Sequence, residues 1–162
     1  MRRRTSVRRL RWSAWVVASL ALAPGAPALA QEAPPSCVPD VHSVLVRVHG
    51  VRSNSGVLVA VLYGDNPNDF LKKGARLARE RVRARVGSVA MCLGAPRPGV
   101  YAVAVYHDEN DNRRFDRSWI GLPSEGFGVS NNPRPVLRAP THRESAFEVG
   151  TASTIVNVDL QY

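Results

Sequence analysis

Oxygen-bearing side chains recur at alternate positions in one short segment of the chain. Asp108, Asn110 and Asn112 are each separated by one residue, and Asp116 follows four residues later. Counted from Asp108 these are positions 1, 3, 5 and 9, the spacing with which a calcium-binding EF-hand loop begins. Calcium takes about six to eight oxygen ligands, and a backbone carbonyl at position 7 would add another. The spacing therefore predicts a structural Ca²⁺ site made of Asp108, Asn110, Asn112, Arg114 and Asp116.

Two positions of this segment depart from the EF-hand pattern. Arg113 stands at position 6, where that pattern has glycine, and Trp119 stands at position 12, where it has a bidentate glutamate. No helical pattern precedes the segment, so we expect a calcium-type loop after a β-strand, with Glu125 or Asp111 completing the ligand shell. The alternative is a loop of Asx turns without a metal, because Asp and Asn side chains hydrogen-bond to their own backbone.

The residues around this loop include polar and aromatic side chains with no obvious place in a strand. We interpret them as a candidate face for a ligand or a partner protein, because loops on a rigid scaffold often carry function. This candidate face comprises His107, Trp119, Glu125, Phe127, Asn131 and Asn132. Its aromatic residues, together with Tyr106 and Phe115, either line a groove or pin the loop to the domain.

An enzymatic alternative uses some of the same residues. His107, Asp108 and Glu125 are acid or base groups, so an envelope hydrolase is the second hypothesis. The sequence contains neither the G-x-S-x-G elbow of serine hydrolases nor the H-E-x-x-H motif of zinc peptidases. We therefore assign no catalytic residue and expect a non-enzymatic binding or accessory protein of the bacterial envelope.

Residues 1–30 have the organisation of a cleavable signal peptide. An arginine-rich start precedes an apolar run from Trp12 to Ala23, and the small-residue pattern Ala28-Leu29-Ala30 follows. This order of regions defines a secretory signal. The apolar run is about 12 residues long, whereas a membrane-spanning helix needs about 20. We expect a periplasmic or secreted protein with no transmembrane anchor after cleavage.

The charge of the exported part argues against nucleic acid as a partner. The chain has 22 Lys and Arg residues against 13 Asp and Glu residues, and six of the arginines lie within residues 1–30. Without them, 16 basic residues remain against 13 acidic ones, a net charge of about +3. A nucleic-acid-binding domain would keep a stronger basic excess. An envelope protein or a small ligand is the expected partner, and its identity and the oligomeric state stay open.

The chain has two cysteines, Cys37 and Cys92. Export places them in an oxidising compartment, where disulfides form, so we predict a bond between them. Two reduced thiols are the alternative. Residues 31–41 hold several prolines and little apolar pattern, and we expect them to form a flexible lead-in to a single domain over residues 42–162.

Alternation of apolar and polar residues predicts that this domain is built from strands. Val44, Val46 and Val48 fall on one side of the segment 42–49, as in a half-buried strand. Residues 57–63 follow an Asn-Ser-Gly turn, and we expect these first two strands to pair as a hairpin. Further strands are predicted at residues 77–86, 89–93, 100–106, 146–149 and 154–160.

About seven short strands without a long helix indicate an all-β domain. We expect an antiparallel β-sandwich of immunoglobulin-like or transthyretin-like type, with a small closed barrel as the alternative. A helix competes for residues 77–86, because Ala, Arg and Glu are good helix formers. Arginines that alternate with apolar residues there favour a strand with an exposed arginine face. Residues 107–142 are expected to be irregular.

Two motifs resemble those of a known bacterial family. The strand and loop from Gly99 to Asp116 read G-x-Y-A and then H-D-x-N-x-N-x-x-x-D, and residues 121–132 read G-x-P-x-E-G-x-G-x-S-N-N. Over roughly residues 43–162 the chain resembles domain-of-unknown-function family 2141. The resemblance implies a small exported β-sandwich and brings no activity with it. The family loop usually has glycine where this chain has Arg113.

Overall fold

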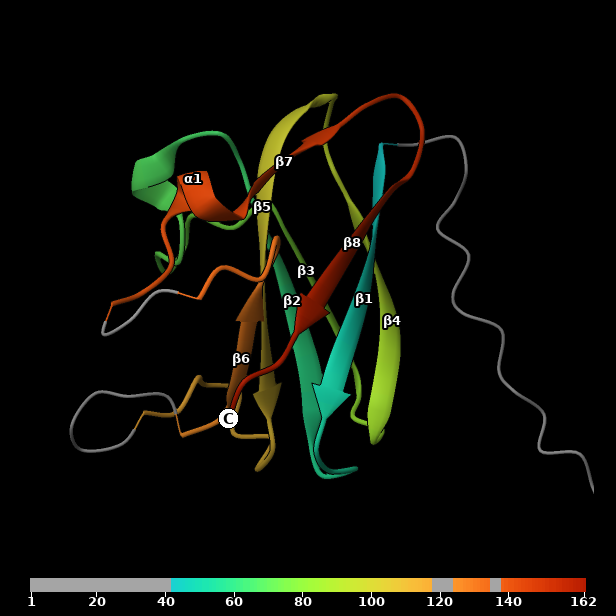
Figure 1. Cartoon of the computed structure of the whole chain (residues 1–162), viewed down its shortest axis with the longest axis vertical. Coiled ribbons are helices and arrows are strands. Elements are labelled where there is room, and N and C mark those ends of the chain that lie inside the picture. The colour runs from blue at the N-terminus through green and yellow to red at the C-terminus, as the bar shows by residue number, and fades with distance from the viewer. Residues whose placement is uncertain (1–41, 118–123, 135–137) are drawn as a thin grey trace, which may run out of the picture. The chain divides into compact units, whose positions relative to one another are not determined.

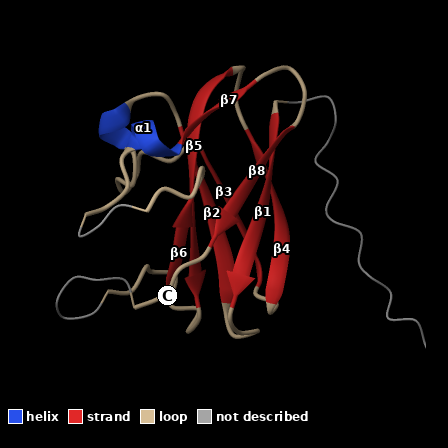
Figure 2. Cartoon of the chain, in the orientation of Figure 1, coloured by secondary structure: helices blue, strands red, loops and turns tan. Residues whose placement is uncertain are grey.

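The computed structural model describes residues 42–117, 124–134 and 138–162, all of which belong to one unit of the chain. The predicted signal peptide, the lead-in segment, Cys37 and Trp119 lie outside the described residues. The described strands form two facing sheets (Figure 1), and colouring by secondary structure shows how little helix accompanies them (Figure 2). Within the described ranges, no helix is long and apolar enough to cross a membrane.

The smaller sheet has three strands in the order β4-β1-β8. The central strand β1 spans Ser43–Val51. Strand β4, Gly87–Gly94, pairs with it antiparallel, and strand β8, Thr154–Asp159, pairs with it parallel. This parallel pair brings the last strand of the chain beside the first.

The larger sheet has the strand order β3-β2-β5-β6, and a further strand, β7, also pairs with β5. The pairs along this path are antiparallel. Its strands are β2 (Val57–Tyr63), β3 (Ala78–Arg83), β5 (Gly99–Asp108), β6 (Gly126–Val129) and β7 (Ala146–Val149). Two short helical turns lie outside the sheets, η1 (Pro67–Asp69) and α1 (His142–Ser145).

The prediction of an all-β sandwich is confirmed, and the segment 77–86 contains a strand, β3, as favoured over a helix. The predicted hairpin of β1 and β2 is wrong, because these strands belong to different sheets. Both faces of β2 are buried, so it needs a central place between β3 and β5, and the connection at residues 52–56 crosses from one sheet to the other. The described chain also forms β6 within residues 107–142, which were expected to be irregular, and α1 begins at the last residue of that range.

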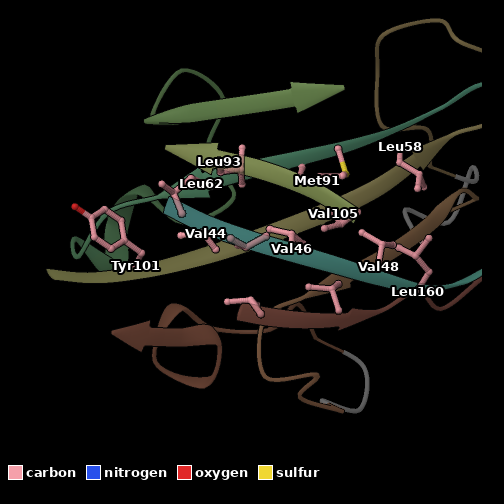
Figure 3. Close-up of a cluster of buried hydrophobic side chains, with 14 of the residues drawn as sticks. Val44, Val46, Val48, Leu58, Leu62, Met91, Leu93, Tyr101, Val105 and Leu160 are labelled. Atoms are coloured by element: carbon pink, nitrogen blue, oxygen red, sulfur yellow. The ribbon is translucent and has the colours of Figure 1, made fainter. Parts of the chain in front are cut away.

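Side chains from both sheets fill the space between them. Val44, Val46 and Val48 of β1 are fully buried, as their alternation predicts. Figure 3 shows them facing side chains of the larger sheet such as Leu62 and Val105. Burial of each valine side chain contributes about 1.5 kcal/mol or more. This interior fixes which side of every strand faces outward.

A second apolar cluster lies on the outer face of the larger sheet. It contains Val59, Val61, Tyr63, Ala104 and Val129, all from strands of that sheet. Side chains alternate along a strand, so the residues of β5 with even numbers lie on this outer face and those with odd numbers face the interior. The alternation decides which residues at the end of β5 meet the loop that follows.

Strand β6 contains two glycines, Gly126 and Gly128, although glycine is not favoured in strands. A Cβ atom on Gly126 would lie 2.4 Å from the ring of Tyr162, and one on Gly128 would lie 2.5 Å from the carbonyl oxygen of Asp159. Phe127 and Gln161 exchange backbone hydrogen bonds of 2.8 and 2.9 Å at this crossing. The glycines therefore let residues 159–162 pass close to β6.

Candidate calcium loop

The candidate loop starts at the last residue of β5. His107 and Asp108 are consecutive, and the alternation of the strand sends their side chains to opposite faces of the sheet. Asp108 lies on the outer face and its side chain is completely buried. Glu125 precedes β6, which pairs with β5 through Gly126 and His107. The same alternation brings Glu125 beside Asp108.

Side-chain oxygens of the loop accept hydrogen bonds from its own backbone. The two carboxylate oxygens of Asp108 accept from the N–H groups of Asn112 and Arg113, each at 2.9 Å. Asn110 Oδ1 accepts from Asn112 N at 3.1 Å, and Asn112 Oδ1 accepts from Arg114 N at 2.8 Å. These bonds fold the segment into the Asx turns that the sequence allowed.

Arg113 adopts the conformation that glycine favours at this position. Its φ angle is +67°, and that of Asp111 is +52°. A side chain in this left-handed region costs about 1–2 kcal/mol. The missing glycine therefore does not prevent the turn, because the two bonds to Asp108 hold the backbone in place.

Asp116 closes the loop from its far end. Its Oδ2 atom accepts hydrogen bonds from the amide groups of Asn110 and Asn112, at 2.9 and 2.7 Å. The backbone N–H of Asp116 donates to Glu125 Oε2 at 3.0 Å. Positions 1, 3, 5 and 9 are thus linked to one another and to Glu125.

Glu125 is a buried carboxyl group with an incomplete set of partners. The residue is 4 % exposed, and among the described residues its Oε1 atom has no hydrogen-bond partner. Burial raises the pKa of Glu125, and the nearby carboxylates of Asp108 and Asp116 raise it further, against the opposing effects of the backbone N–H groups of Asp116 and Glu109. An unsatisfied, buried acceptor of this kind costs about 1–3 kcal/mol.

The donor set matches a hard cation better than a transition metal. It offers carboxylate and amide oxygens, which calcium prefers, and no sulfur or accessible imidazole. Among the described residues, no three His, Cys, Asp or Glu side chains form a group that could hold a metal by themselves. Calcium would therefore need the asparagine oxygens as well, and the Asn110 and Asn112 amides would have to release Asp116.

His107 lies in a separate network on the inner side of β5. It is fully buried, Nε2 is 2.8 Å from the carbonyl oxygen of Ser55, and Nδ1 is 2.8 Å from the hydroxyl oxygen of Tyr162. Both ring nitrogens are engaged. His107 lies on the opposite face of β5 from Asp108 and Glu125.

Glu109, at position 2 of the loop, faces away from the candidate ligands. Arg52 Nε donates to its Oε1 atom at 3.1 Å, and Ser53 donates to the same oxygen at 3.0 Å. The hydrogen bond from Arg52 is the main reason why the pKa of Glu109 lies below its usual range. Arg52 also lies over the ring of Tyr162, 4.1 Å from its centroid. These contacts attach the start of the loop to the residues after β1.

Sequence reasoning missed Arg81, which it placed on an exposed arginine face. The Nη2 atom of Arg81 lies 2.5 Å from Asp111 Oδ1 and 3.6 Å from Asp108 Oδ2. Arg81 reaches the loop because β2 pairs with both β3 and β5, with Val59 opposite Arg81 on one side and Tyr106 on the other. The alternation of residues in β3 indicates that Arg81 faces outward. No local sequence pattern shows, however, that β5 lies on the far side of β2 from β3, within reach of the Arg81 side chain.

Asn131 and Asn132 bind the protein's own backbone. The side-chain amide of Asn131 donates to the carbonyl of Ala146 at 2.8 Å, and Asn132 Oδ1 accepts from the N–H of Asp159 at 2.8 Å. The preceding Ser130 is fully buried, and its hydroxyl bridges Val103 and Ser145. Asn131 and Asn132 follow β6, whereas Glu125 precedes it. The residues of the candidate face therefore lie at two opposite ends of this strand.

Phe127 of the candidate face and the neighbouring Tyr106 pack on the outer apolar cluster. The ring of Phe115 lies 5.6 Å from that of Tyr106 and 5.4 Å from that of Phe127. These contacts favour the interpretation that the rings pin the loop to the sheet. A hollow of about 240 Å³ lies elsewhere, lined by Leu77, Arg97 and Val100 among others, and by none of the predicted site residues.

Cys92 lies in β4, opposite Leu45 of β1, and its side chain is partly buried. Its predicted partner, Cys37, falls outside the described ranges. The Cys37–Cys92 disulfide therefore stays a prediction.

Comparison with known proteins agrees with the resemblance seen in the motifs. No curated protein and no solved structure matches the chain. A family model described as "Uncharacterized protein conserved in bacteria (DUF2141)" matches residues 46–157, which include the candidate loop, Glu125 and most of both sheets. The match covers more than half of the chain, so the protein belongs to this bacterial family.

Proposed function

We propose that this protein is an exported, non-enzymatic β-sandwich accessory protein of the bacterial envelope, whose 108–116 loop binds calcium. Asp108, Asn110, Asn112 and Asp116 supply side-chain oxygens, and Arg114 supplies its backbone carbonyl. Glu125 takes the part that a glutamate at position 12 plays in an EF-hand. The bound ion stabilises the loop and joins it to β6.

The observation that carries this proposal is the carboxyl group of Glu125. Buried polar groups in proteins are nearly always satisfied, and an exception needs an explanation. Among the residues that the structure describes, Glu125 Oε1 is buried without a hydrogen-bond partner beside Asp108 and Asp116, whose charges already disfavour the ionised form of Glu125. A divalent cation at this point would satisfy the oxygen and offset the repulsion among three carboxylates.

Calcium titration of the purified protein tests the proposal. We expect a calorimetric binding signal with one ion per chain, and a rise in melting temperature between EDTA and excess calcium. Ligand at a hundredfold its dissociation constant adds about 2.7 kcal/mol to the free energy of unfolding. Asp116→Asn should lose both effects, because it removes a carboxylate while keeping an acceptor for the two asparagine amides.

Asp65→Asn provides the matched control. Asp65 is exposed in the loop after β2, so the substitution makes the same chemical change away from the candidate ligands. It should bind calcium as the unmodified protein does. Absence of both binding heat and a thermal shift in the unmodified protein, at calcium up to several millimolar, would contradict the metal assignment and leave an Asx-turn loop.

The location in the envelope rests on the segment that precedes the described residues. The predicted signal peptide supports export, and an oxidising compartment supports a Cys37–Cys92 bond. In the chain-entropy model a closed loop of this length contributes about 4 kcal/mol. The mass of the protein from the envelope fraction, before and after reduction and alkylation, tests both points. A full-length chain with two alkylated thiols before reduction would refute them.

A further inference from the structure

Arg81 places a positive charge beside the first residue of the loop. It lies on the outer face of β3, and its side chain is 28 % exposed, whereas that of Asp108 is fully buried. Its Nη2 atom is 2.5 Å from Asp111 Oδ1 and 3.6 Å from Asp108 Oδ2. Asp111 is not one of the proposed calcium ligands. Its ion pair with Arg81 holds the guanidinium group next to Asp108, which is one of them.

Asp108 thus has neighbours of both kinds of charge. The N–H groups of Asn112 and Arg113 donate to its two oxygens, the carboxyl group of Glu125 lies nearby, and the guanidinium group of Arg81 is 3.6 Å from Oδ2. Without a metal, the guanidinium group partly neutralises a carboxylate that the fold buries. With a metal, the same charge lies within a few ångströms of a divalent cation and repels it.

We propose that Arg81 is a built-in competing cation, which stabilises the loop in the absence of calcium and lowers its affinity for calcium. This inference rests on the proposed function and concerns the regulation of the same site. We expect the weakened site to have a dissociation constant of about 10⁻⁴–10⁻³ M, the range in which extracellular calcium modules work. The loop would then respond to the calcium concentration outside the cytoplasm.

Three substitutions separate the charge of Arg81 from its other contributions. Arg81→Gln removes the charge, Arg81→Lys keeps it, and Arg47→Gln removes a charge from the exposed face of the smaller sheet. Calcium dissociation constants are measured by calorimetry, and melting temperatures are measured in EDTA and in excess calcium. We expect Arg81→Gln to bind calcium at least tenfold more tightly, about the effect of removing a nearby charge at a water-like dielectric constant. The other two variants should stay within about threefold of the unmodified protein.

The melting temperatures give a second and independent readout. Arg81→Gln should melt below the unmodified protein in EDTA, because Asp108 loses its ion pair, and the deficit should disappear or reverse in calcium. A variant that folds only with calcium would show the same behaviour in a stronger form. A deficit of equal size in both conditions would mean that Arg81 acts only as a structural contact, which would overturn the inference.

The outcomes also separate this inference from the proposed function. If the unmodified protein binds calcium and Arg81→Gln binds with the same affinity, the competition is refuted and the calcium loop stands. If only Arg81→Gln binds, the competition stands and calcium is not a ligand of the natural protein at physiological concentration. If neither binds, or if Arg81→Lys tightens binding as much as Arg81→Gln does, the competing-cation inference is refuted.

Discussion

Glu125→Gln should have opposite effects on stability with and without calcium. The substitution keeps an oxygen that can accept the hydrogen bond from the N–H of Asp116, now 3.0 Å long. It replaces the unpartnered oxygen with an amide that can donate to the nearby carboxylates of Asp108 or Asp116. Removal of an unsatisfied, buried acceptor is worth about 1–3 kcal/mol. In EDTA at neutral pH we expect the variant to be more stable by about 1–2 kcal/mol.

The sign of this gain follows from the direction of the pKa shift. The pKa of Glu125 is raised by burial above its ordinary value of 4.5. As pH rises past 4.5, the unfolded chain releases its proton before the folded protein does, so the unmodified protein loses stability until the folded group has also ionised. Glutamine cannot ionise. The advantage of the variant should therefore be absent below about pH 4 and present at pH 7.

Thermal unfolding followed by circular dichroism measures both effects. One kcal/mol corresponds to about 4 °C for a domain of this size. The variant should melt about 4–8 °C higher than the unmodified protein in EDTA, and it should not gain the further stability that calcium gives the unmodified protein. Glu148→Gln, an exposed carboxyl on β7, is the control for the change in charge. The reasoning would be refuted by a variant that is less stable in EDTA, or by one that keeps the full calcium-dependent rise.

Three further substitutions test the loop backbone and the pH dependence of the fold. Arg113→Gly relieves a φ angle of +67° and should raise the free energy of unfolding by about 0.5–1 kcal/mol in EDTA. Arg114 has no such φ angle, so Arg114→Gly should lower the free energy of unfolding. Denaturant titration measures both changes, and a change in the same direction for the two variants would contradict this explanation. Glu144 accepts hydrogen bonds from Arg138 and Thr141, which hold its pKa well below its ordinary value of 4.5. A carboxyl group whose pKa is lower in the folded protein stabilises the fold at pH values above its unfolded pKa. Glu144→Gln should therefore lower the melting temperature at pH 7, and this deficit should shrink as the pH falls below about 4.5. A series of melting curves at different pH values measures both effects.

Local pattern was enough to predict most of the strands. The alternation of Val44, Val46 and Val48 reports a buried face directly, and all three valines are fully buried. Strand β6 escaped detection because Gly126 and Gly128 have low strand propensity. They are required there by the close passage of residues 159–162. The partners of β1 were also mispredicted, because an Asn-Ser-Gly turn allows a change of sheet as well as a hairpin.

The candidate site was predictable to the extent that it is local in sequence. Spacing alone selected Asp108, Asn110, Asn112 and Asp116, and the structure links all four by hydrogen bonds. Arg81 could not be found in this way, since its contact with Asp108 depends on β2 lying between β3 and β5. The separation of His107 from Asp108 and Glu125 follows from strand alternation and could have been predicted once β5 was extended to Asp108.

The back-to-back placement of His107 and Asp108 restricts how the family can change its length. An insertion or deletion of one residue within β5 would exchange the two faces of the strand. It would turn the carboxylate of Asp108 towards the interior and the imidazole of His107 towards the loop, with an unpaired charge buried as the result. Length variation is therefore tolerable in the connections between strands and not within Gly99–Asp108. Relatives aligned with a gap in that strand are expected to lack both the calcium loop at Asp108 and the buried contacts of His107.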